Sequence, residues 1–238
     1  MSYPRIAWAY WPALDVCLVA LIEHAPVVAQ QPDEPQALFD GRTLNGWKGD
    51  ETLWRIEDNA ITGETKPEAP IRANSFLIWD GGELENFELR LKFRIFSGNS
   101  GVQYRSRDLG DFQVGGYQAD IDADGNWIGI LYDEHGRGIL CRRGERVSIG
   151  KDGQRTTATI DDFDQEKFST ATPGGQWHEY VIRAEGSKVS QAINGITTIE
   201  LDDHEQGKAH ARGIIALQLH SGPAMKVQFK DITLKRLP

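Results

Sequence analysis

Residues 87–95 read FELRLKFRI, from Phe87 to Ile95, with an apolar side chain at every odd position and a charged one at every even position. Successive side chains of a β-strand point to opposite faces, so this alternation predicts a strand with one face buried and the other in solvent. It is the clearest strand signal in the chain and indicates a sheet that covers a core on one side.

Shorter strands separated by turns are expected on both sides of this stretch. Asp58-Asn59 separates two short apolar runs and predicts a small hairpin, and Asn194-Gly195, a pair suited to positive φ angles, predicts another. Helical periodicity is hard to find beyond the N-terminal segment, apart from a turn near residues 161–168. Many antiparallel strands predict an all-β fold, a β-sandwich or barrel, with a mixed α/β fold as the alternative.

The composition limits the classes of partner. The 238 residues contain 26 Lys and Arg against 35 Asp and Glu, a formal net charge of -9. Nucleic acid binding needs basic side chains to neutralise phosphates, so this acidic balance argues against a nucleic acid partner. Cys17 and Cys141 are the only cysteines in the sequence, which excludes a disulfide framework and a cysteine-rich metal site.

The N-terminal segment has the pattern of an export signal. A positive charge precedes a mostly apolar stretch that ends in small residues, so we expect residues 1–29 to be a signal peptide and the protein to be exported, to the periplasm or outside the cell. Asp15 interrupts the apolar stretch, which leaves a mis-assigned start or an uncleaved anchor as alternatives. A stable membrane span would need about 20 clean apolar residues, and we expect none. Residues 30–36 predict a polar linker, and residues 37–238 a single domain.

Three predicted strands carry amide and ionisable side chains at two-residue intervals, which puts them on one face of each strand. These side chains are Gln103 and Arg105 on the first strand, Gln118, Asp120 and Asp122 on the second, and Gln218 and His220 on the third. Planar hydrogen-bonding groups in place of Lys and Glu predict a polar cleft of the size of a sugar. Three ordinary solvated faces are the alternative.

A short acidic motif suggests a metal. Asp120, Asp122 and Asp124, followed by a glycine, match the opening of an EF-hand calcium loop. The twelfth position is Leu131 where a bidentate glutamate is needed, and no helix is expected at either side, so the EF-hand is rejected. A divalent ion held by some of these carboxylates with His220 stays open, because a Lewis acid polarises a keto–enol pair. No motif in the sequence requires any other cofactor.

Five ordered segments carry a family resemblance. They are LFDGRTLNGW (38–47), NSGVQYR (99–105), GYQADI (116–121), LYDE (131–134), and IALQLH (215–220) with FKDI (229–232). Together they resemble the 3-keto-disaccharide hydrolase family, also described as 3-keto-glucoside 1,2-lyase or 3-keto-2-hydroxy-glucal hydratase domains. The resemblance implies a concanavalin A-like jelly-roll β-sandwich of two antiparallel sheets, usually exported from bacteria, that acts on sugars oxidised at C3. Many members have Glu-Val-Gln where this chain has Gln118-Ala119-Asp120, so any carboxylate here is expected from Asp120 or Asp122.

That activity sets chemical requirements. A ketone at C3 acidifies the hydrogen on C2, its removal expels the glycosidic oxygen from C1, and water then adds at C1. The route needs a base, a proton donor for the leaving oxygen, and donors to the enolate. We expect a 3-keto sugar or oligosaccharide as the partner. The assigned residues are His220 or Asp120 as base, Arg105 as ketone or enolate stabiliser, Tyr132 as proton donor, Gln103, Gln118, Gln218, Asp122 and Glu134 as substrate contacts, and Trp127 or Trp47 as stacking surfaces.

Each assignment has an alternative. Arg105 can instead pair with Asp120 and hold two strands together, and His220 can simply end a strand at a turn. Ordinary hydrolysis by a carboxylate pair also stays open, since four carboxylates can converge, those of Asp120, Asp122, Asp133 and Glu134. At the level of function, the alternative to an enzyme is a non-catalytic, lectin-like carbohydrate-binding module. The sequence does not predict an oligomeric state.

Overall fold

The computed structural model describes Met1 and residues 34–238. Nearly all of the predicted signal peptide (1–29) and most of the predicted linker (30–36) lie outside the described residues. The elements are β1 (Gln36–Ala37), β2 (Trp47–Lys48), β3 (Trp54–Glu57), β4 (Ala60–Glu64), β5 (Ser75–Trp79), β6 (Phe87–Ser97), β7 (Asn99–Gly110), β8 (Gln113–Asp122), β9 (Leu131–Glu134), β10 (Gly138–Cys141), β11 (Glu145–Ile149), β12 (Arg155–Thr159), α1 (Gln165–Ala171), β13 (His178–Glu185), β14 (Lys188–Ile193), β15 (Ile196–Asp203), β16 (Ile214–Leu219) and β17 (Lys226–Arg236).

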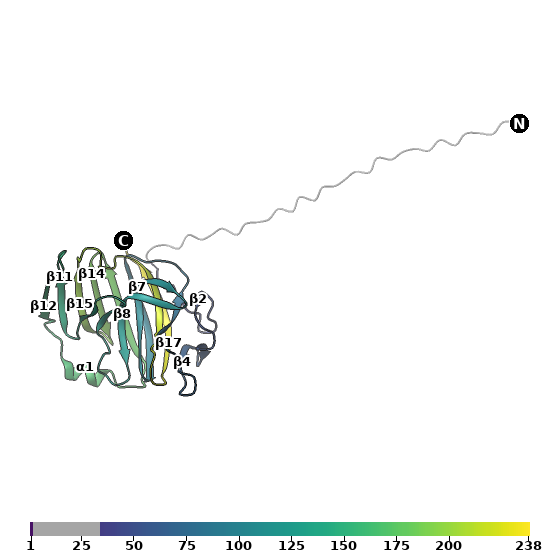
Figure 1. The fold of residues 1–238 in the computed structure, drawn as a ribbon, viewed down its shortest axis with the longest axis horizontal. Coiled ribbons are helices and arrows are strands. Elements are labelled where there is room, and N and C mark those ends of the chain that lie inside the picture. The colour runs from purple at the N-terminus through teal and green to yellow at the C-terminus, as the bar shows by residue number, and fades with distance from the viewer. Residues whose placement is uncertain (2–33) are drawn as a thin grey trace. The chain divides into compact units, whose positions relative to one another are not determined.

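The strands form two sheets packed as a sandwich (Figure 1). One sheet runs in the order β12-β11-β15-β14-β13-β6-β17-β4-β3, with β1 paired to β17, and the other in the order β10-β9-β8-β7-β16-β5-β2. The fold is the expected all-β, concanavalin A-like jelly-roll sandwich. Among the strands of the described residues, only β11 and β15 form a parallel pair.

The stretch FELRLKFRI forms β6, as predicted, and continues to Ser97. Its odd-numbered side chains, from Phe87 to Ile95, are at most 3% exposed and belong to the core between the sheets. β6 lies between β13 and β17, in the middle of its sheet. Burial of each such side chain stabilises the fold by about 1.5–3 kcal/mol. This face of β6 therefore contributes a large share of the hydrophobic free energy that drives folding.

The predicted turns also form. β3 pairs with β4, and β14 with β15 across a tight turn in which Asn194 and Gly195 have φ angles of 50° and 78°. Helix α1 begins after Asp164, whose side chain accepts hydrogen bonds from the backbone N–H groups of Glu166 and Lys167 and caps the helix N-terminus. This helix is the turn expected near residues 161–168.

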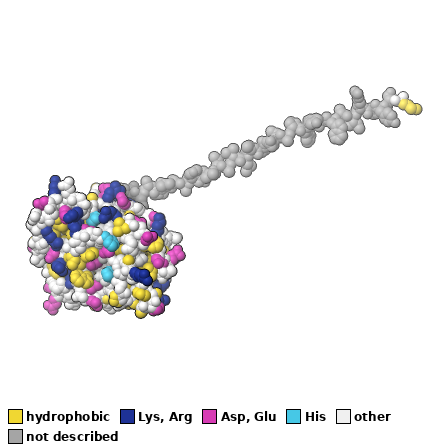
Figure 2. All heavy atoms as spheres, in the orientation of Figure 1, with side chains coloured by type: hydrophobic (Ala, Val, Ile, Leu, Met, Phe, Trp, Pro, Cys, Tyr) yellow, Lys and Arg dark blue, Asp and Glu magenta, His cyan; other side chains and the backbone are white. Residues whose placement is uncertain are grey.

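The surface of the folded body is mixed in charge. Figure 2 shows basic and acidic side chains interspersed with apolar ones over the visible face. Among the described residues, no helix has both the length and the apolar character needed to cross a membrane.

Candidate functional site

Most of the polar side chains predicted to line a cleft, though not Arg105, lie on the outer face of the seven-stranded sheet. Gln103 on β7 lies opposite Gln118 on β8, and Gln118 lies opposite Tyr132 on β9. On the other side of β7, β16 carries Gln218 and is followed at once by His220. Strand pairing therefore brings together segments that are far apart in the sequence.

A cavity of about 380 Å³ opens on this face. It is lined by Asn74, Asn99, Gln118, Asp120, Trp127, Ile130, Tyr132, Glu134, Ile139 and His220. Its volume falls within the range of about 300–1,000 Å³ that is usual for small-molecule sites. Six of the residues assigned from the sequence share this lining: Gln118, Asp120, Trp127, Tyr132, Glu134 and His220.

A larger hollow, of about 780 Å³, lies over β11, β13, β14 and β15 of the other sheet. Charged side chains on its walls pair with one another, as Arg146 does with Glu200 and Arg183 with Glu185. These pairs are exposed to solvent, as on an ordinary sheet surface. Among the residues that line these two cavities, the one whose pKa is shifted most lies at the smaller cavity.

That group is Asp120, which is 7% exposed. The pKa of its carboxyl is raised to about 8, mainly by burial. A hydrogen bond from Gln118 lowers this pKa, and the negative charges of Asp122 and Glu134 raise it. The carboxyl is therefore mainly protonated at neutral pH. A protonated carboxyl on a cavity wall is suited to act as a general acid rather than as the base.

A chain of hydrogen bonds ends at Asp120. Ser106 donates to Gln103 Oε1 (2.6 Å), Gln103 donates to Gln118 Oε1 (2.8 Å), and Gln118 donates to Asp120 Oδ1 (2.5 Å). Gln103 is fully buried behind the cavity wall, so the prediction that it contacts the substrate is wrong. It contacts Gln118, which lines the cavity. Gly101 makes room for this arrangement, because a Cβ there would lie 2.5 Å from Gln118 Cγ.

Gln218 is also fully buried, beside this chain and not on the cavity wall. Its Oε1 accepts a hydrogen bond from Gln118 Nε2 at 3.3 Å, while its Nε2 has no partner within the described part of the chain. An unpaired buried donor costs about 1–3 kcal/mol, and such groups are concentrated at sites where a ligand or water completes the bonding. The expected direct contact of Gln218 with substrate is not seen.

His220 lies on the cavity wall, and its side chain is exposed. Its Nδ1 is 2.5 Å from the carbonyl oxygen of Ser221. A carbonyl oxygen only accepts hydrogen bonds, so Nδ1 carries the hydrogen and, in the neutral ring, Nε2 keeps a free lone pair. The arrangement suits His220 to the role of base, for which the sequence offered His220 or Asp120.

Asn74, just before β5, was missed by the sequence reasoning. It donates to Glu134 Oε1 and accepts a hydrogen bond from the backbone N–H of Ser221, both at 2.9 Å. It therefore ties Glu134 on the cavity wall to the loop that carries His220. Its partners lie 60 and 147 positions away in the sequence, so no local pattern marks it.

Two aromatic side chains complete the lining. Burial raises the pKa of the Tyr132 hydroxyl, and the carboxyl groups of Glu134 and Asp120 raise it further, so this hydroxyl stays a hydrogen-bond donor. Trp127 is 44% exposed, which leaves its ring open to stack on a sugar. Trp47, the other candidate for stacking, is buried and donates its Nε1–H to the backbone oxygen of Leu38, so it belongs to the core.

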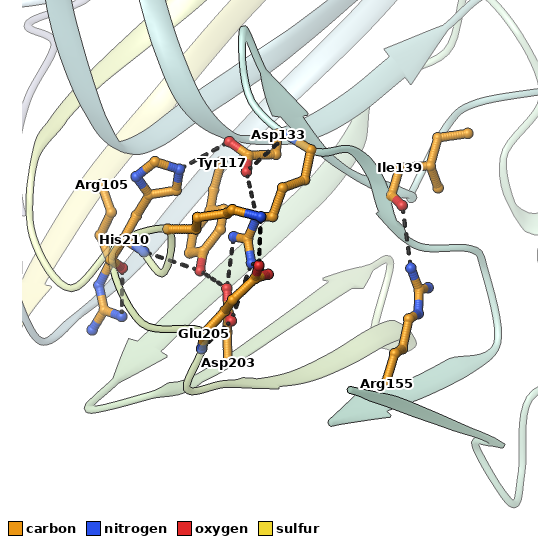
Figure 3. Close-up of polar contacts among 10 residues, drawn as sticks. Arg105, Tyr117, Asp133, Ile139, Arg155, Asp203, Glu205 and His210 are labelled. Carbon is orange, nitrogen blue, oxygen red and sulfur yellow. Dashed lines mark hydrogen bonds and ion pairs between the residues drawn. The ribbon is translucent and has the colours of Figure 1, made fainter. Parts of the chain in front are cut away.

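Arg105 lies away from the cavity. A bulge after Tyr104 and a φ of 47° at Arg105 interrupt the alternation of β7, so its side chain leaves the face that carries Gln103. The guanidinium is almost completely buried and donates to the backbone carbonyls of Glu85 and Gly186. It also donates to the backbone carbonyl of His210 (Figure 3). The prediction that Arg105 contacts the ketone is therefore wrong. The alternative prediction, an ion pair between Arg105 and Asp120, is wrong as well.

Asp122 also differs from its expected role. Its carboxylate oxygens accept hydrogen bonds from the backbone N–H groups of Asn126, Trp127 and Ile128, so it shapes the loop that carries Trp127. In the described residues, no three His, Cys, Asp or Glu side chains converge as a metal site requires. The set of Asp120, Asp122, Asp124 and His220 is not assembled as ligands, and a divalent ion stays a prediction.

Asp133 takes part in a buried ion network instead of a carboxylate pair at the cavity. It binds His210 Nε2 and Arg137 Nε, each at 2.9 Å, and Arg137 also binds Asp203 at 2.7 Å (Figure 3). Burial raises the pKa values of Asp133 and Asp203, but the hydrogen bonds from these partners outweigh it and lower both. The carboxyl groups that remain at the cavity are those of Asp120 and Glu134.

The chain is similar in sequence to known proteins over most of its length. Residues 34–235 match the 3-keto-alpha-glucoside-1,2-lyase-like domain. A 3-keto-disaccharide hydrolase from Bacteroides thetaiotaomicron is 27% identical over 174 residues, which cover 68% of this chain and 57% of that protein. The chain therefore spans little more than half the length of this relative.

Solved structures support the fold. A Parabacteroides distasonis protein, whose assignment as a glycosyl hydrolase is provisional, has a TM-score of 0.58 at 19% identity, covering 86% of this chain and 94% of its own. The carbohydrate-binding module CBM66 from Bacillus subtilis has a TM-score of 0.52 at 15% identity, covering 80% of this chain and 95% of its own. At these identities the likeness shows the fold alone. The sequence match over most of its length shows that the chain belongs to the family of 3-keto-alpha-glucoside-1,2-lyase-like domains.

Proposed function

We propose that this protein is a carbohydrate-active enzyme that cleaves the glycosidic bond of 3-keto-glycosides by elimination followed by hydration. One observation carries the proposal: a protonated carboxyl, Asp120, and an imidazole with a free Nε2 lone pair, His220, line the same cavity. The family match supports a substrate oxidised at C3.

In the elimination, His220 Nε2 takes the proton from C2, and the C2–H electron pair forms an enolate with the C3 oxygen. The Tyr132 hydroxyl donates a hydrogen bond to that oxygen, which carries the developing negative charge. The electron pair then returns from the enolate to form the C1–C2 double bond, the C1–O bond breaks, and Asp120 protonates the leaving oxygen.

In the hydration, the ionised Asp120 takes a proton from water as the water oxygen bonds to C1. The protonated His220 returns a proton to C2, which restores both residues. The net reaction consumes one glycoside and one water and yields a 3-keto sugar and an alcohol. A carboxyl with a pKa of about 8 suits both proton transfers near neutral pH.

The cavity favours an uncharged sugar. Its lining contains the carboxyl groups of Asp120 and Glu134 and no Lys or Arg. A uronate or phosphate group on the substrate would meet the negative charge of Glu134, with no Lys or Arg in the lining to offset it. Trp127 offers the aromatic surface on which a neutral pyranose ring stacks.

Direct hydrolysis is the second candidate. The negative charge of Glu134 contributes to the raised pKa of Asp120, and an acid beside a second carboxyl is the arrangement that ordinary glycosidases use. That route needs neither a ketone at C3 nor His220.

Matched substrates separate the two routes. Purified protein is incubated with methyl 3-keto-glucoside and with methyl glucoside, and methanol release and the ultraviolet band of the enone are followed. The proposal expects cleavage of the oxidised substrate only, and a fall of about 100-fold or more in kcat for His220→Ala. His204→Ala, at an exposed histidine paired with Asp202, is the control.

Other outcomes would redirect the assignment. Comparable cleavage of the unoxidised glucoside would support direct hydrolysis. Binding of an unoxidised oligosaccharide without turnover of either substrate would support a lectin-like module. The same assay with and without a chelator tests the divalent ion.

We also propose that the protein is exported and that residues 1–29 are its signal peptide. The supporting observations are the apolar stretch and its small-residue end. The intact mass of the protein recovered from a bacterial host checks this, because cleavage after Ala29 leaves a chain that begins at Gln30.

A further inference from the structure

Asn74 joins two parts of the cavity wall that strand pairing does not bring together. Its Nδ2 donates to Glu134 Oε1, and its Oδ1 accepts a hydrogen bond from the backbone N–H of Ser221, each at 2.9 Å. Glu134 ends β9, whereas Asn74 immediately precedes β5, and three strands, β8, β7 and β16, lie between β9 and β5 in the sheet. A single side chain therefore links distant strands of one sheet at the cavity.

The register of β5 and β16 puts Asn74 beside His220. The last pair of these antiparallel strands is Leu219 with Ser75, so the next positions along the two segments are His220 and Asn74. Both residues line the cavity. The backbone of Asn74 is itself held, because its carbonyl oxygen accepts a hydrogen bond from the side chain of Gln113. Asn74 is therefore a fixed point against which the His220 segment is placed.

The loop that begins at His220 is anchored at both ends. At its far end, the Met225 N–H donates to Thr65 Oγ1 at 3.1 Å, and the Thr65 N–H donates to the Met225 carbonyl at 3.0 Å. At its near end, the His220 N–H donates to Met225 Sδ at 3.1 Å, and the Ser221 N–H donates to Asn74. The bond to Asn74 is thus the one that ties Ser221 to the opposite wall of the cavity.

Ser221 in turn fixes the tautomer of the His220 ring. Its carbonyl oxygen lies 2.5 Å from Nδ1 and only accepts hydrogen bonds, so the neutral ring carries its hydrogen on Nδ1 and has a lone pair on Nε2. An exposed imidazole without such a partner exchanges between its two tautomers in water. The Nε2–H tautomer has no lone pair on Nε2 with which to take a proton. The proposed base therefore depends on where Ser221 is held.

We infer that Asn74 is a positioning residue for the proposed reaction: it holds Ser221 so that His220 keeps the tautomer in which Nε2 acts as base. This inference rests on the proposed function. Glu134 sets the orientation of the Asn74 amide, because a carboxylate accepts a hydrogen bond from Nδ2 only and thereby turns Oδ1 toward Ser221. Asn74 itself transfers no proton.

Nitrogen-15 NMR of the histidine rings tests the inference. At about pH 8.5, where an ordinary histidine is neutral, the chemical shifts of the two ring nitrogens report which one carries the hydrogen. The His220 signals are assigned by their absence from the spectrum of His220→Ala. The wild type should show mainly the Nδ1–H tautomer, and Asn74→Ala a mixture of both tautomers.

The same variant should lose turnover more than binding. On methyl 3-keto-glucoside, Asn74→Ala should lower kcat about tenfold or more and leave KM within about threefold, because a misplaced base slows the chemical step. Asn45→Ala, at an exposed asparagine outside this cavity, is the matched control and should keep the wild-type kcat and tautomer.

An exchange of amide and carboxylate gives a rescue test. Asn74→Asp keeps an oxygen for the Ser221 N–H but sets a second carboxylate against Glu134, so at pH 7.5 it should lose kcat as Asn74→Ala does. Addition of Glu134→Gln restores a donor that faces an acceptor, with the total charge of the wild type. The double variant should regain the Nδ1–H tautomer and come within about threefold of the kcat of Glu134→Gln alone.

The outcomes separate this inference from the proposed function. If the wild type cleaves the substrate and Asn74→Ala keeps both its kcat and its tautomer, the inference is wrong and the proposed function stands. A lower melting temperature with an unchanged tautomer would give Asn74 a role in stability alone, which overturns the inference too. So would a double variant that is no better than Asn74→Asp. If the wild type does not cleave the substrate, the proposed function fails and the inference about its base fails with it.

Discussion

Gln118 donates its side-chain amide to Oδ1 of Asp120 at 2.5 Å, across two residues of the same strand. Because Oδ1 accepts this bond, the proton of the carboxyl is carried by Oδ2. The orientation of the Gln118 amide is fixed in turn by Gln103, which donates to its oxygen. Gln103 is therefore a positioning residue for the proposed acid, although it does not line the cavity.

Gln103→Leu should lower kcat about tenfold and shift the alkaline limb of the pH–rate profile to higher pH. The bond from Gln118 lowers the pKa of Asp120, so a Gln118 amide that no longer holds its orientation lets that pKa rise. The measurement is kcat against pH on methyl 3-keto-glucoside. A lower melting temperature with an unmoved alkaline limb would mean that Gln103 only supports the fold.

The contribution of Asp120 to the free energy of unfolding should fall as pH rises from about 4 to about 8, because the folded protein holds the Asp120 proton more tightly than the unfolded chain does. An unperturbed aspartate carboxyl has a pKa of 3.8, whereas that of folded Asp120 is about 8, so its stabilising effect is complete below the lower value and is lost as the pH rises through the upper one. Asp120→Asn removes this dependence. Urea unfolding at pH 5 and pH 8.5 should show the wild type losing at least about 1.4 kcal/mol more than the variant, the equivalent of one pKa unit. Equal losses would show that the pKa of Asp120 is not raised.

Arg105→Met should destabilise the protein by about 3 kcal/mol or more, because it leaves buried backbone carbonyls without their donor. The kcat/KM of the folded variant should stay within about twofold of the wild type, since the guanidinium is not at the cavity. Urea unfolding and the activity assay at low temperature check both statements. Arg107→Met, at an exposed position on the same strand, is the matched control. A large loss of kcat in a stable Arg105 variant would restore a catalytic role.

Arg137→Met should cost about 3–5 kcal/mol at pH 7, because it leaves the buried carboxylates of Asp133 and Asp203 without their cation. Their pKa values are lowered in the folded state, so this ion network stabilises the fold above the ordinary carboxyl pKa and loses that effect in acid. The difference between variant and wild type should therefore persist from pH 7 to about pH 4 and shrink as the pH falls further, through the lowered pKa values of the two carboxyls. Arg146→Met removes an exposed pair with Glu200 and should cost less than about 1 kcal/mol. Similar costs for the two variants would contradict this account.

The elements that the sequence predicted are those whose signal is local. The alternation of FELRLKFRI follows from the two-residue period of a strand, and Asn194-Gly195 marks its hairpin through backbone conformations that few other residues adopt. The same period put Gln118 and Asp120 on one face, and the strand pairing brings that face to His220. The predicted signal peptide, residues 1–29, lies almost entirely outside the described residues.

The sequence by itself determined the all-β class, the strand faces and the set of chemical groups available, because these depend on residue type and on spacing within a few positions. Only the tertiary structure decided which groups share a cavity and in which protonation state. A bulge turned Arg105 away from its predicted face, and Asn74 joined the site through partners far along the chain. Burial, together with the negative charges of Asp122 and Glu134, raises the pKa of Asp120 to about 8, which is why we propose it as the acid. Each of these depends on neighbours from distant parts of the chain, and the solvation and charge they impose cannot be read from local sequence.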